Sequence, residues 1–226
     1  MASDGKLGLF FEGQRMHFAV LVILLAAVWE LSGLAGFGAG EFLGLSTMGW
    51  VALSVGDAVL HQVYVWLCWR AELHGQTLSR WFGPKAFTLY AVLFTALFAA
   101  RPILAFALGW SNRGTLDIHP WAGWGIALVL FLPAVYLMIS IRRYFSFRRA
   151  FGIDHFEPGY RSLPMVRDGI FRFSPNAMYV FGFFMLWVPA FLFQSMAAMV
   201  IAAFSHAYIW VHYYATEKPD MKRIYG

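Results

Sequence analysis

Four residues near the end of the chain have the types and spacing to bind a polar molecule. They are His206, Trp210, Tyr213 and Glu217, within the segment SHAYIWVHYYATEKPDMKRIYG. Their intervals place all four on one face of an ideal α-helix. An apolar run precedes them and a dense polar segment follows, so we expect this face to lie where a helix reaches a membrane surface.

The composition predicts an integral membrane protein. Of the 226 residues, 60% are hydrophobic and only 13% are charged, whereas soluble domains carry about 25% charged residues. The 23 Phe, 10 Trp and 10 Tyr are typical of a protein with aromatic belts at both lipid interfaces. The single cysteine, Cys68, excludes a disulfide framework within the chain.

The predicted fold class is all-α, a polytopic membrane helix bundle of about six spans (five to six). Runs of roughly 20 apolar residues predict four spans, near 17–35, 48–69, 86–108 and 121–141. Residues 177–214 can hold two more helices with a tight turn between Pro189 and Ser195, so the last two spans would form a helical hairpin. Alternatively, Pro189 and Gln194 mark a kink in a single helix.

The basic residues predict the orientation. If both termini, the 70–85 loop and residues 142–175 share one side, all seventeen Lys and Arg except Arg101 and Arg113 lie there. The positive-inside rule then makes both termini cytoplasmic, in a bacterial inner membrane or an endoplasmic reticulum membrane. The net charge of +5 fits contact with anionic lipid and requires no nucleic acid.

One integral-membrane domain is expected over residues 1–226. It comprises a four-span bundle at 17–141 and a second part at 142–226, which contains a cytoplasmic loop, the hairpin and the tail. The loop begins with four arginines suited to lipid phosphate, namely Arg142, Arg143, Arg148 and Arg149. Its prolines and glycines exclude one long helix, so we expect an ordered cytoplasmic loop.

Two segments carry a resemblance to a known family. The stretch RDGIFRFSPNAMYVFG, followed by an apolar hairpin and HYYATEKPDMKRIYG, resembles the end of the integral-membrane methyltransferases that act on phospholipids and on isoprenylcysteine carboxyl groups. Within that family the ending is most similar to phosphatidylethanolamine N-methyltransferases. The resemblance covers the last sixty to seventy residues and implies N-methylation of phosphatidylethanolamine, and of its methylated products, toward phosphatidylcholine with S-adenosylmethionine.

The family encloses its cofactor between a loop and a helix end. In the loop pattern Gly-x-[Phe/Tyr]-x-x-x-Arg-[His/Asn]-Pro-x-Tyr, this chain matches at Gly169, Phe171, Asn176 and Tyr179. Asn176 also has the chemistry of a helix N-cap.

This chain departs from the family pattern at three positions. Pro175 stands where the family has Arg, Ala177 where it has Pro, and Lys218 where it has a second Glu. Arg172 is the residue we expect to replace the missing cation.

The chemistry of S-adenosylmethionine suits these residue types. Its sulfonium favours aromatic faces, its hydroxyls and ammonium favour a carboxylate, and its own carboxylate favours Arg or backbone N–H. The predicted cofactor-binding residues are Gly169, Phe171, Arg172, Asn176, Tyr179, His206, Trp210, Tyr213 and Glu217.

A lipid amine must lose a proton before it can accept a methyl group. His212 and Glu217 flank the predicted cofactor site and are candidates for the base, although either could serve only in binding. Asp57 and His61 lie one helical turn apart inside a span and could relay a proton. They could equally form a hydrogen-bonded pair that fixes helix packing.

Two further expectations concern polar residues elsewhere. Glu30 and Arg101 both fall toward the noncytoplasmic ends of their spans, where they could form an ion pair. No His-x-x-x-His or His-Glu-x-x-His spacing occurs, so no metal site is predicted.

Three other functions remain open from the sequence. A carboxyl methyltransferase for prenylated cysteine is the nearest, and a sterol-type membrane reductase with a nicotinamide cofactor has a similar carboxy-terminal half. A transporter or scaffold is also compatible with a polytopic bundle. The polar carboxy-terminal face favours an enzyme, because paired broken helices at the midplane would be typical of a transporter.

Overall fold

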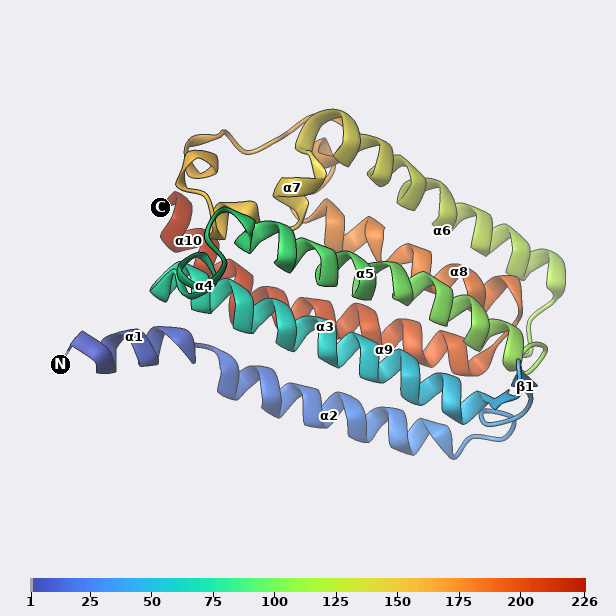
Figure 1. Cartoon of the computed structure of the whole chain (residues 1–226). Helices are drawn as coiled ribbons and strands as arrows, with labels where there is room; N and C mark the ends of the chain where they lie inside the picture. Colours follow the sequence, from blue (N-terminus) through green and yellow to red (C-terminus); the bar gives the residue numbers. More distant parts are fainter. Residues whose placement is uncertain (1) are drawn as a thin grey trace.

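The computed structural model describes the backbone of residues 2–226 and the side chains of residues 6–226. Helices run alongside one another as a bundle (Figure 1). The long ones are α2 (Gln14–Ser32), α3 (Thr47–Gly75), α5 (Ala86–Ser111), α6 (Pro120–Ser140) and α9 (Met196–His212). The short ones are α1 (Ala2–Phe10), α4 (Thr77–Phe82), α7 (Phe147–Ala150), α8 (Phe184–Leu192) and α10 (Lys218–Tyr225). Two short antiparallel strands, β1 (Glu41–Phe42) and β2 (Leu45–Ser46), form a hairpin between α2 and α3.

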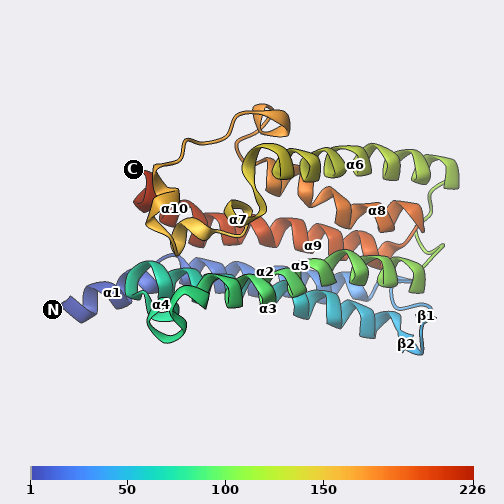
Figure 2. The ribbon, with the colours of Figure 1, turned by 45° about the horizontal axis from the view of Figure 1, so that its top comes forward.

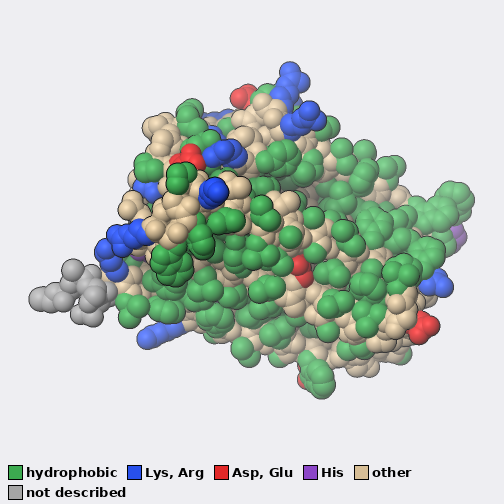
Figure 3. All heavy atoms as spheres, in the orientation of Figure 1, with side chains coloured by type: hydrophobic (Ala, Val, Ile, Leu, Met, Phe, Trp, Pro, Cys, Tyr) green, Lys and Arg blue, Asp and Glu red, His purple; other side chains and the backbone are tan. Residues whose placement is uncertain are grey.

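The helices form a membrane protein. Among the described residues, five helical stretches are long and apolar enough to cross a bilayer, and hydrophobic side chains cover much of the face in Figure 3. The predicted all-α polytopic bundle is therefore confirmed. The stretch that contains α9 is the most buried of the five: 61% of the residues in its most apolar part are buried inside the protein. The reason is that α9 packs against α2, α3, α5 and α8.

Helices α8 and α9 form the expected hairpin, but they differ in length. The apolar helical stretch Met178–Leu192 is no longer than 17 residues, and a complete span requires roughly 20. The turn after α8 ends at Ser195, whose side chain accepts a hydrogen bond from Ala198 N and caps α9. The structure therefore has five long spans and one shorter helix, and Pro189 lies inside α8.

The β end of the bundle, which carries β1, β2 and the α8–α9 turn, is fastened by one buried amide. Asn112 is 1% exposed, and its Nδ2 donates to the carbonyl oxygens of Gly36, Phe37 and Ala39 at 2.9–3.0 Å. Its Oδ1 accepts from Ala197 N at 2.9 Å. One side chain thus joins the α2–α3 loop, the end of α5 and the hairpin.

A glycine permits the close packing at this end. Gly40 has a φ of +91°, and a Cβ atom there would lie 2.0 Å from Ser111 O. Only glycine fits both the left-handed backbone and the contact.

The opposite end of the bundle carries both chain termini, α4, α7 and α10 (Figures 1 and 2). We call it the basic end, because most of the Lys and Arg residues gather there. The 142–175 segment is ordered as α7 and three short 3₁₀ turns. Three π-helical turns also occur in the helices that reach this end, at Ile141–Phe145, Met178–Gly182 and Tyr213–Glu217.

Candidate active site

Aromatic residues from the two arms of the hairpin meet at the basic end. The Tyr179 ring, in the Met178–Gly182 π turn, lies 5.9 Å from the ring of Trp210 and 5.5 Å from that of Tyr213. Trp210 and Tyr213 are 5.6 Å apart. The structure thus brings together three predicted cofactor residues, which we call the aromatic cluster. Ring centroids at these separations form a surface on which a cation can bind.

Glu217 ends the π turn that follows α9. Its Oε2 is buried and has no hydrogen-bond partner among the described residues. A buried carboxylate oxygen without a partner is costly, so this atom is suited to a donor from outside the chain. The ammonium or hydroxyl groups of a ligand would provide one.

The π turn sets the position of Glu217 relative to the aromatic cluster. A π-helix holds more residues per turn than an α-helix, and single π turns occur frequently at functional sites. The ideal α-helical face predicted for His206, Trp210, Tyr213 and Glu217 therefore holds only as far as Tyr213.

His206 contacts α8. Trp187 Nε1 donates to His206 Nδ1 at 3.2 Å, and the His206 ring is stacked on Phe183 at 5.6 Å. These contacts join α9 to α8, so His206 supports the hairpin one turn before Trp210.

The predicted loop residues divide into buried and open positions. Phe171 is 6% exposed and stacks on Phe145 at 5.1 Å. Gly169 has a φ of +60°, and a Cβ atom there would lie 2.7 Å from Ser140 Oγ and 2.9 Å from the Tyr144 ring. Both residues therefore pack the loop onto the end of α6.

Arg172 and Asn176 remain accessible beside that packed part. Arg172 is exposed, with its guanidinium over the Phe173 ring at 5.2 Å. Asn176 is half-buried. Its carbonyl oxygen accepts from Tyr179 N and Val180 N, so it begins the helical turn that carries Tyr179.

His212 faces away from the aromatic cluster, toward α2 and α3. It is 2% exposed, and its ring centroid lies 5.8 Å from Trp69 and 6.4 Å from His17. Its Nδ1 has no partner among the described residues. Of the two candidate bases, only Glu217 lies in the turn that leads directly from the cluster.

A buried hydrogen-bonded chain beside His212 was not predicted from the sequence. Tyr208 OH and His17 Nε2 are 2.7 Å apart, and His17 Nδ1 lies 2.9 Å from Gln14 Oε1. Gln14 Nε2 donates to Thr216 Oγ1 at 3.1 Å. Because Gln14 Oε1 is an acceptor, His17 Nδ1 carries the proton and Tyr208 donates to Nε2. The chain attaches α2 to α9 and to the turn that holds Glu217.

Arg101 pairs with Asp57, and the expected Glu30–Arg101 pair is wrong. Arg101 Nε lies 3.6 Å from Asp57 Oδ2, whereas Glu30 is exposed. His61 contacts Phe94 edge-on at 4.7 Å, and its Nδ1 has no partner among the described residues. Asp57 and His61 therefore form no hydrogen-bonded pair with each other. Asp57 is remote from the basic end, because it lies about 27 Å along α3 from Gly75, the last residue of that helix, at 1.5 Å per residue. A part for Asp57 and His61 in proton transfer remains a prediction.

The four arginines after α6 differ in their contacts. Arg148 pairs with Glu157 at 2.9 Å, and Arg149 donates to Pro164 O at 3.2 Å, so both organise the loop. Arg142 and Arg143 are exposed and form no ion pair among the described residues. These two have guanidinium groups available for lipid phosphate.

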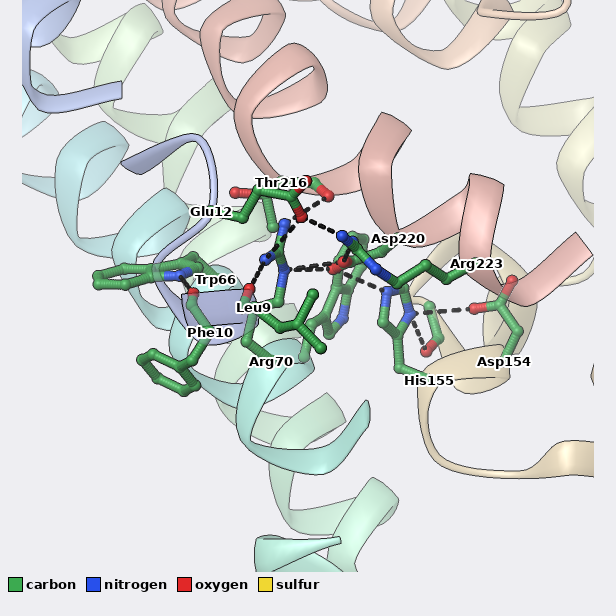
Figure 4. A network of polar contacts seen from close by, with 12 residues as sticks. Leu9, Phe10, Glu12, Trp66, Arg70, Asp154, His155, Thr216, Asp220 and Arg223 are labelled. Carbon is green, nitrogen blue, oxygen red and sulfur yellow. Dashed lines mark hydrogen bonds and ion pairs between the residues drawn. The ribbon is translucent and has the colours of Figure 1, made fainter. Parts of the chain in front are cut away.

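A network of buried charges fastens the tail at the basic end (Figure 4). Arg70, fully buried on α3, donates from Nε to Asp220 on α10 at 2.8 Å. It also donates to Leu9 O and thereby holds the amino-terminal segment. Arg223 binds both Glu12 and Asp220. This network was not predicted from the sequence, because its members come from four separate segments.

His155 lies between two carboxylates of this network. Its Nδ1 is 3.2 Å from Asp154 and its Nε2 is 3.6 Å from Asp220, and its ring stacks on Trp69 at 4.1 Å. Burial alone would lower the pKa of His155, but the two carboxylates raise it above its usual value. Burial would raise the pKa of Asp154, but the hydrogen bonds from His155 and Tyr225 lower it. An imidazolium between two carboxylates is therefore favoured.

Comparison with known proteins gives one match to a family model. Residues 123–226 match the family model described as phospholipid methyltransferase, which confirms the resemblance predicted from the sequence. No curated protein and no solved structure matches the chain. The matched region runs from α6 to the tail and includes the aromatic cluster, Glu217 and the 142–175 segment.

Proposed function

We propose that this protein, whose residues 123–226 match the phospholipid methyltransferase family model, uses S-adenosylmethionine to N-methylate phosphatidylethanolamine. The observation that carries the proposal is the aromatic cluster of Tyr179, Trp210 and Tyr213, from which a single π turn, Tyr213–Glu217, leads to the unpartnered, buried Oε2 of Glu217. Aromatic faces and a carboxylate attract cations, and both the cofactor and a methylated amine are cationic.

The residues at the basic end fit the cofactor in kind. The aromatic cluster would hold the sulfonium by cation–π contact, worth roughly 0.5–2 kcal/mol. Glu217 would accept from the ammonium or the ribose hydroxyls. Arg172 and the backbone near Asn176 would bind the methionyl carboxylate, in place of the family arginine that Pro175 replaces. When bound, S-adenosylmethionine supplies an electrophilic methyl group.

The chain must also make the lipid amine nucleophilic. An alkylammonium has a pKa of about 10.4, so removing its proton at pH 7 costs roughly 4–5 kcal/mol. Glu217 is the base that the geometry favours, because its Oε2 is unpartnered and buried and it ends the π turn that begins at Tyr213 of the aromatic cluster. A carboxylate in this position accepts the proton as the amine approaches, and positioning supplies much of the remaining rate acceleration.

Lipid binding would use the exposed cations at the end of α6. Arg142 and Arg143 lie in the π turn Ile141–Phe145, where they can bind the phosphate of a lipid whose amine points toward Tyr179. Both termini would be cytoplasmic, because the positive-inside rule places the basic end there.

Incubation with labelled S-adenosylmethionine in nanodiscs of mixed phospholipids tests the proposal. We expect label in methylated phosphatidylethanolamine, and none with a Glu217→Gln protein at the same concentration. Label found only on a prenylcysteine peptide would replace this proposal with the carboxyl methyltransferase. Binding of NADPH without binding of S-adenosylmethionine would replace it with the reductase.

A further inference from the structure

An apolar groove lies at the β end, remote from the candidate active site. It has a volume of about 530 Å³ and only hydrophobic residues line it, among them Phe42, Trp50, Ile103, Phe106, Trp110 and Phe193. Ligand pockets have volumes of about 300–1,000 Å³. The groove is therefore large enough for a substantial apolar molecule.

The groove opens to the outside of the bundle. Ile103, Phe106 and Trp110 are 67%, 38% and 44% exposed, which in a membrane protein means exposed to lipid. The residues on α5 that line it run from Pro102 to Trp110, about 12 Å at 1.5 Å per residue. Half of a hydrocarbon core about 30 Å thick is about 15 Å. The groove thus follows α5 through most of one leaflet, the depth of an acyl chain.

Contacts among its walls keep the groove open. Trp50 Nε1 donates to Phe42 O at 3.1 Å, and the Trp110 ring lies 5.4 Å from Phe193 and 6.4 Å from Phe42. These contacts come from the β1–β2 hairpin, α3, α5 and the α8–α9 turn. A preformed groove requires little ordering when a ligand binds.

A cation lies beside Trp110, one of the residues that line the groove. Arg113 is exposed, and its guanidinium lies 5.1 Å from the Trp110 ring and donates to Trp110 O at 3.0 Å. No carboxylate lies within 4 Å of it in the described part of the chain, including the nearby Asp117. Arg113 therefore has donors free for an anion at the level where lipid phosphates lie.

We infer that this groove binds one glycerophospholipid of the leaflet at the β end, with an acyl chain along α5 and its phosphate on Arg113. The volume, the depth and the unpaired cation all match that ligand. The lipid would cover the junction that Asn112 fastens and is separate from the substrate lipid at the basic end.

Photocrosslinking tests the site without any measurement of catalysis. Ile103 is replaced by p-benzoylphenylalanine, and the matched control carries the same amino acid at Val92, which is 65% exposed on the same helix. Both proteins are purified in detergent, incubated with phosphatidylglycerol, which lacks the amine of the proposed substrate, and irradiated. We expect at least a fivefold higher yield of lipid adduct at position 103 than at position 92.

Arg113 variants then test the phosphate contact. In the Ile103-substituted protein, Arg113→Gln should reduce the adduct several-fold, Arg113→Lys should retain most of it, and Arg80→Gln at the basic end should leave it unchanged. Equal yields at positions 103 and 92 would mean that only annular lipid is present and would overturn the inference. An adduct with a second copy of the chain would overturn it in favour of a dimer. Loss of methyl transfer with an unchanged adduct would instead count against the proposed function alone.

Discussion

The buried polar side chains at the two ends of the bundle differ in charge and in how completely they are hydrogen-bonded. At the β end the fastening group is a neutral amide, Asn112, which uses both its donor and its acceptor atoms. At the basic end the groups are charged and incompletely paired. Ten buried side-chain atoms lack a hydrogen-bond partner in the described part of the chain, although some of them take part in ion pairs. Six lie in residues of the basic end, and four lie in the middle of the bundle. None lies at the β end.

The backbone shows the same contrast. The β end is closed by a two-stranded hairpin and a capped helix start, whereas helices that reach the basic end carry three π turns. Satisfied neutral hydrogen bonds favour a fixed structure, and unpartnered buried atoms beside irregular helices favour ligand binding. The difference fits the proposal that the β end maintains the fold and the basic end holds the active site.

Breaking the buried ion pair at the basic end should have the largest effect. Arg70→Met leaves Asp220 buried without its main partner, so we expect the free energy of unfolding to fall by about 3–5 kcal/mol. Unfolding of the detergent-solubilised protein measures it. The double variant Arg70→Met/Asp220→Asn should recover part of the loss, and Arg80→Gln serves as the exposed control. A loss below 0.5 kcal/mol, as is typical of surface changes, would contradict a structural role for this pair.

Removing the amide at the β end should cost nearly as much stability but little activity. Asn112→Ala removes the hydrogen bonds to three carbonyl oxygens and leaves Phe37 O and Ala197 N without a partner, so we expect a loss of about 3 kcal/mol. Methyl transfer per folded molecule should stay near the wild-type value at a temperature below the transition. Thr95→Val is the matched control, because its hydroxyl donates only within its own helix, to Ala91 O. A strong loss of activity in folded Asn112→Ala protein would break the division between the two ends.

For Glu217→Gln we expect a large loss of activity and no loss of stability, the opposite of the result expected for Asn112→Ala. If this carboxylate is the base, kcat/KM should fall at least about 100-fold, equivalent to about 2.7 kcal/mol of transition-state stabilisation. Binding of S-adenosylmethionine should weaken about 10-fold or more. Stability should be unchanged or higher, because a neutral amide replaces a buried carboxylate. Lys222→Gln, an exposed change five residues later, is the control, and unchanged binding and rate in Glu217→Gln would remove this residue from the site.

The sequence predicted what depends on local composition and spacing. Apolar runs located the long helices, and the helical interval from Trp210 to Tyr213 brought two cluster residues together correctly. Long-range pairing was not accessible, because Arg70 and Asp220 are 150 residues apart and each has an ordinary local context. For the same reason Arg101 was assigned to Glu30 although it pairs with Asp57. The π turns also escaped prediction, since an ideal α-helical period was assumed through Glu217.

The smallest predicted effect concerns the charge of His155. Its pKa is raised in the folded protein, so its contribution to stability is fully present below its unfolded pKa of about 6.5. That contribution is lost as the pH rises through the higher folded value. We expect the Tm of the wild type to fall between pH 6.5 and pH 9, and the fall to be smaller in His155→Gln. His119→Gln, at an exposed site, should leave the pH dependence unchanged. An identical pH dependence in His155→Gln and the wild type would show that His155 is uncharged, and would remove the imidazolium from the network that fastens the tail beside Glu217.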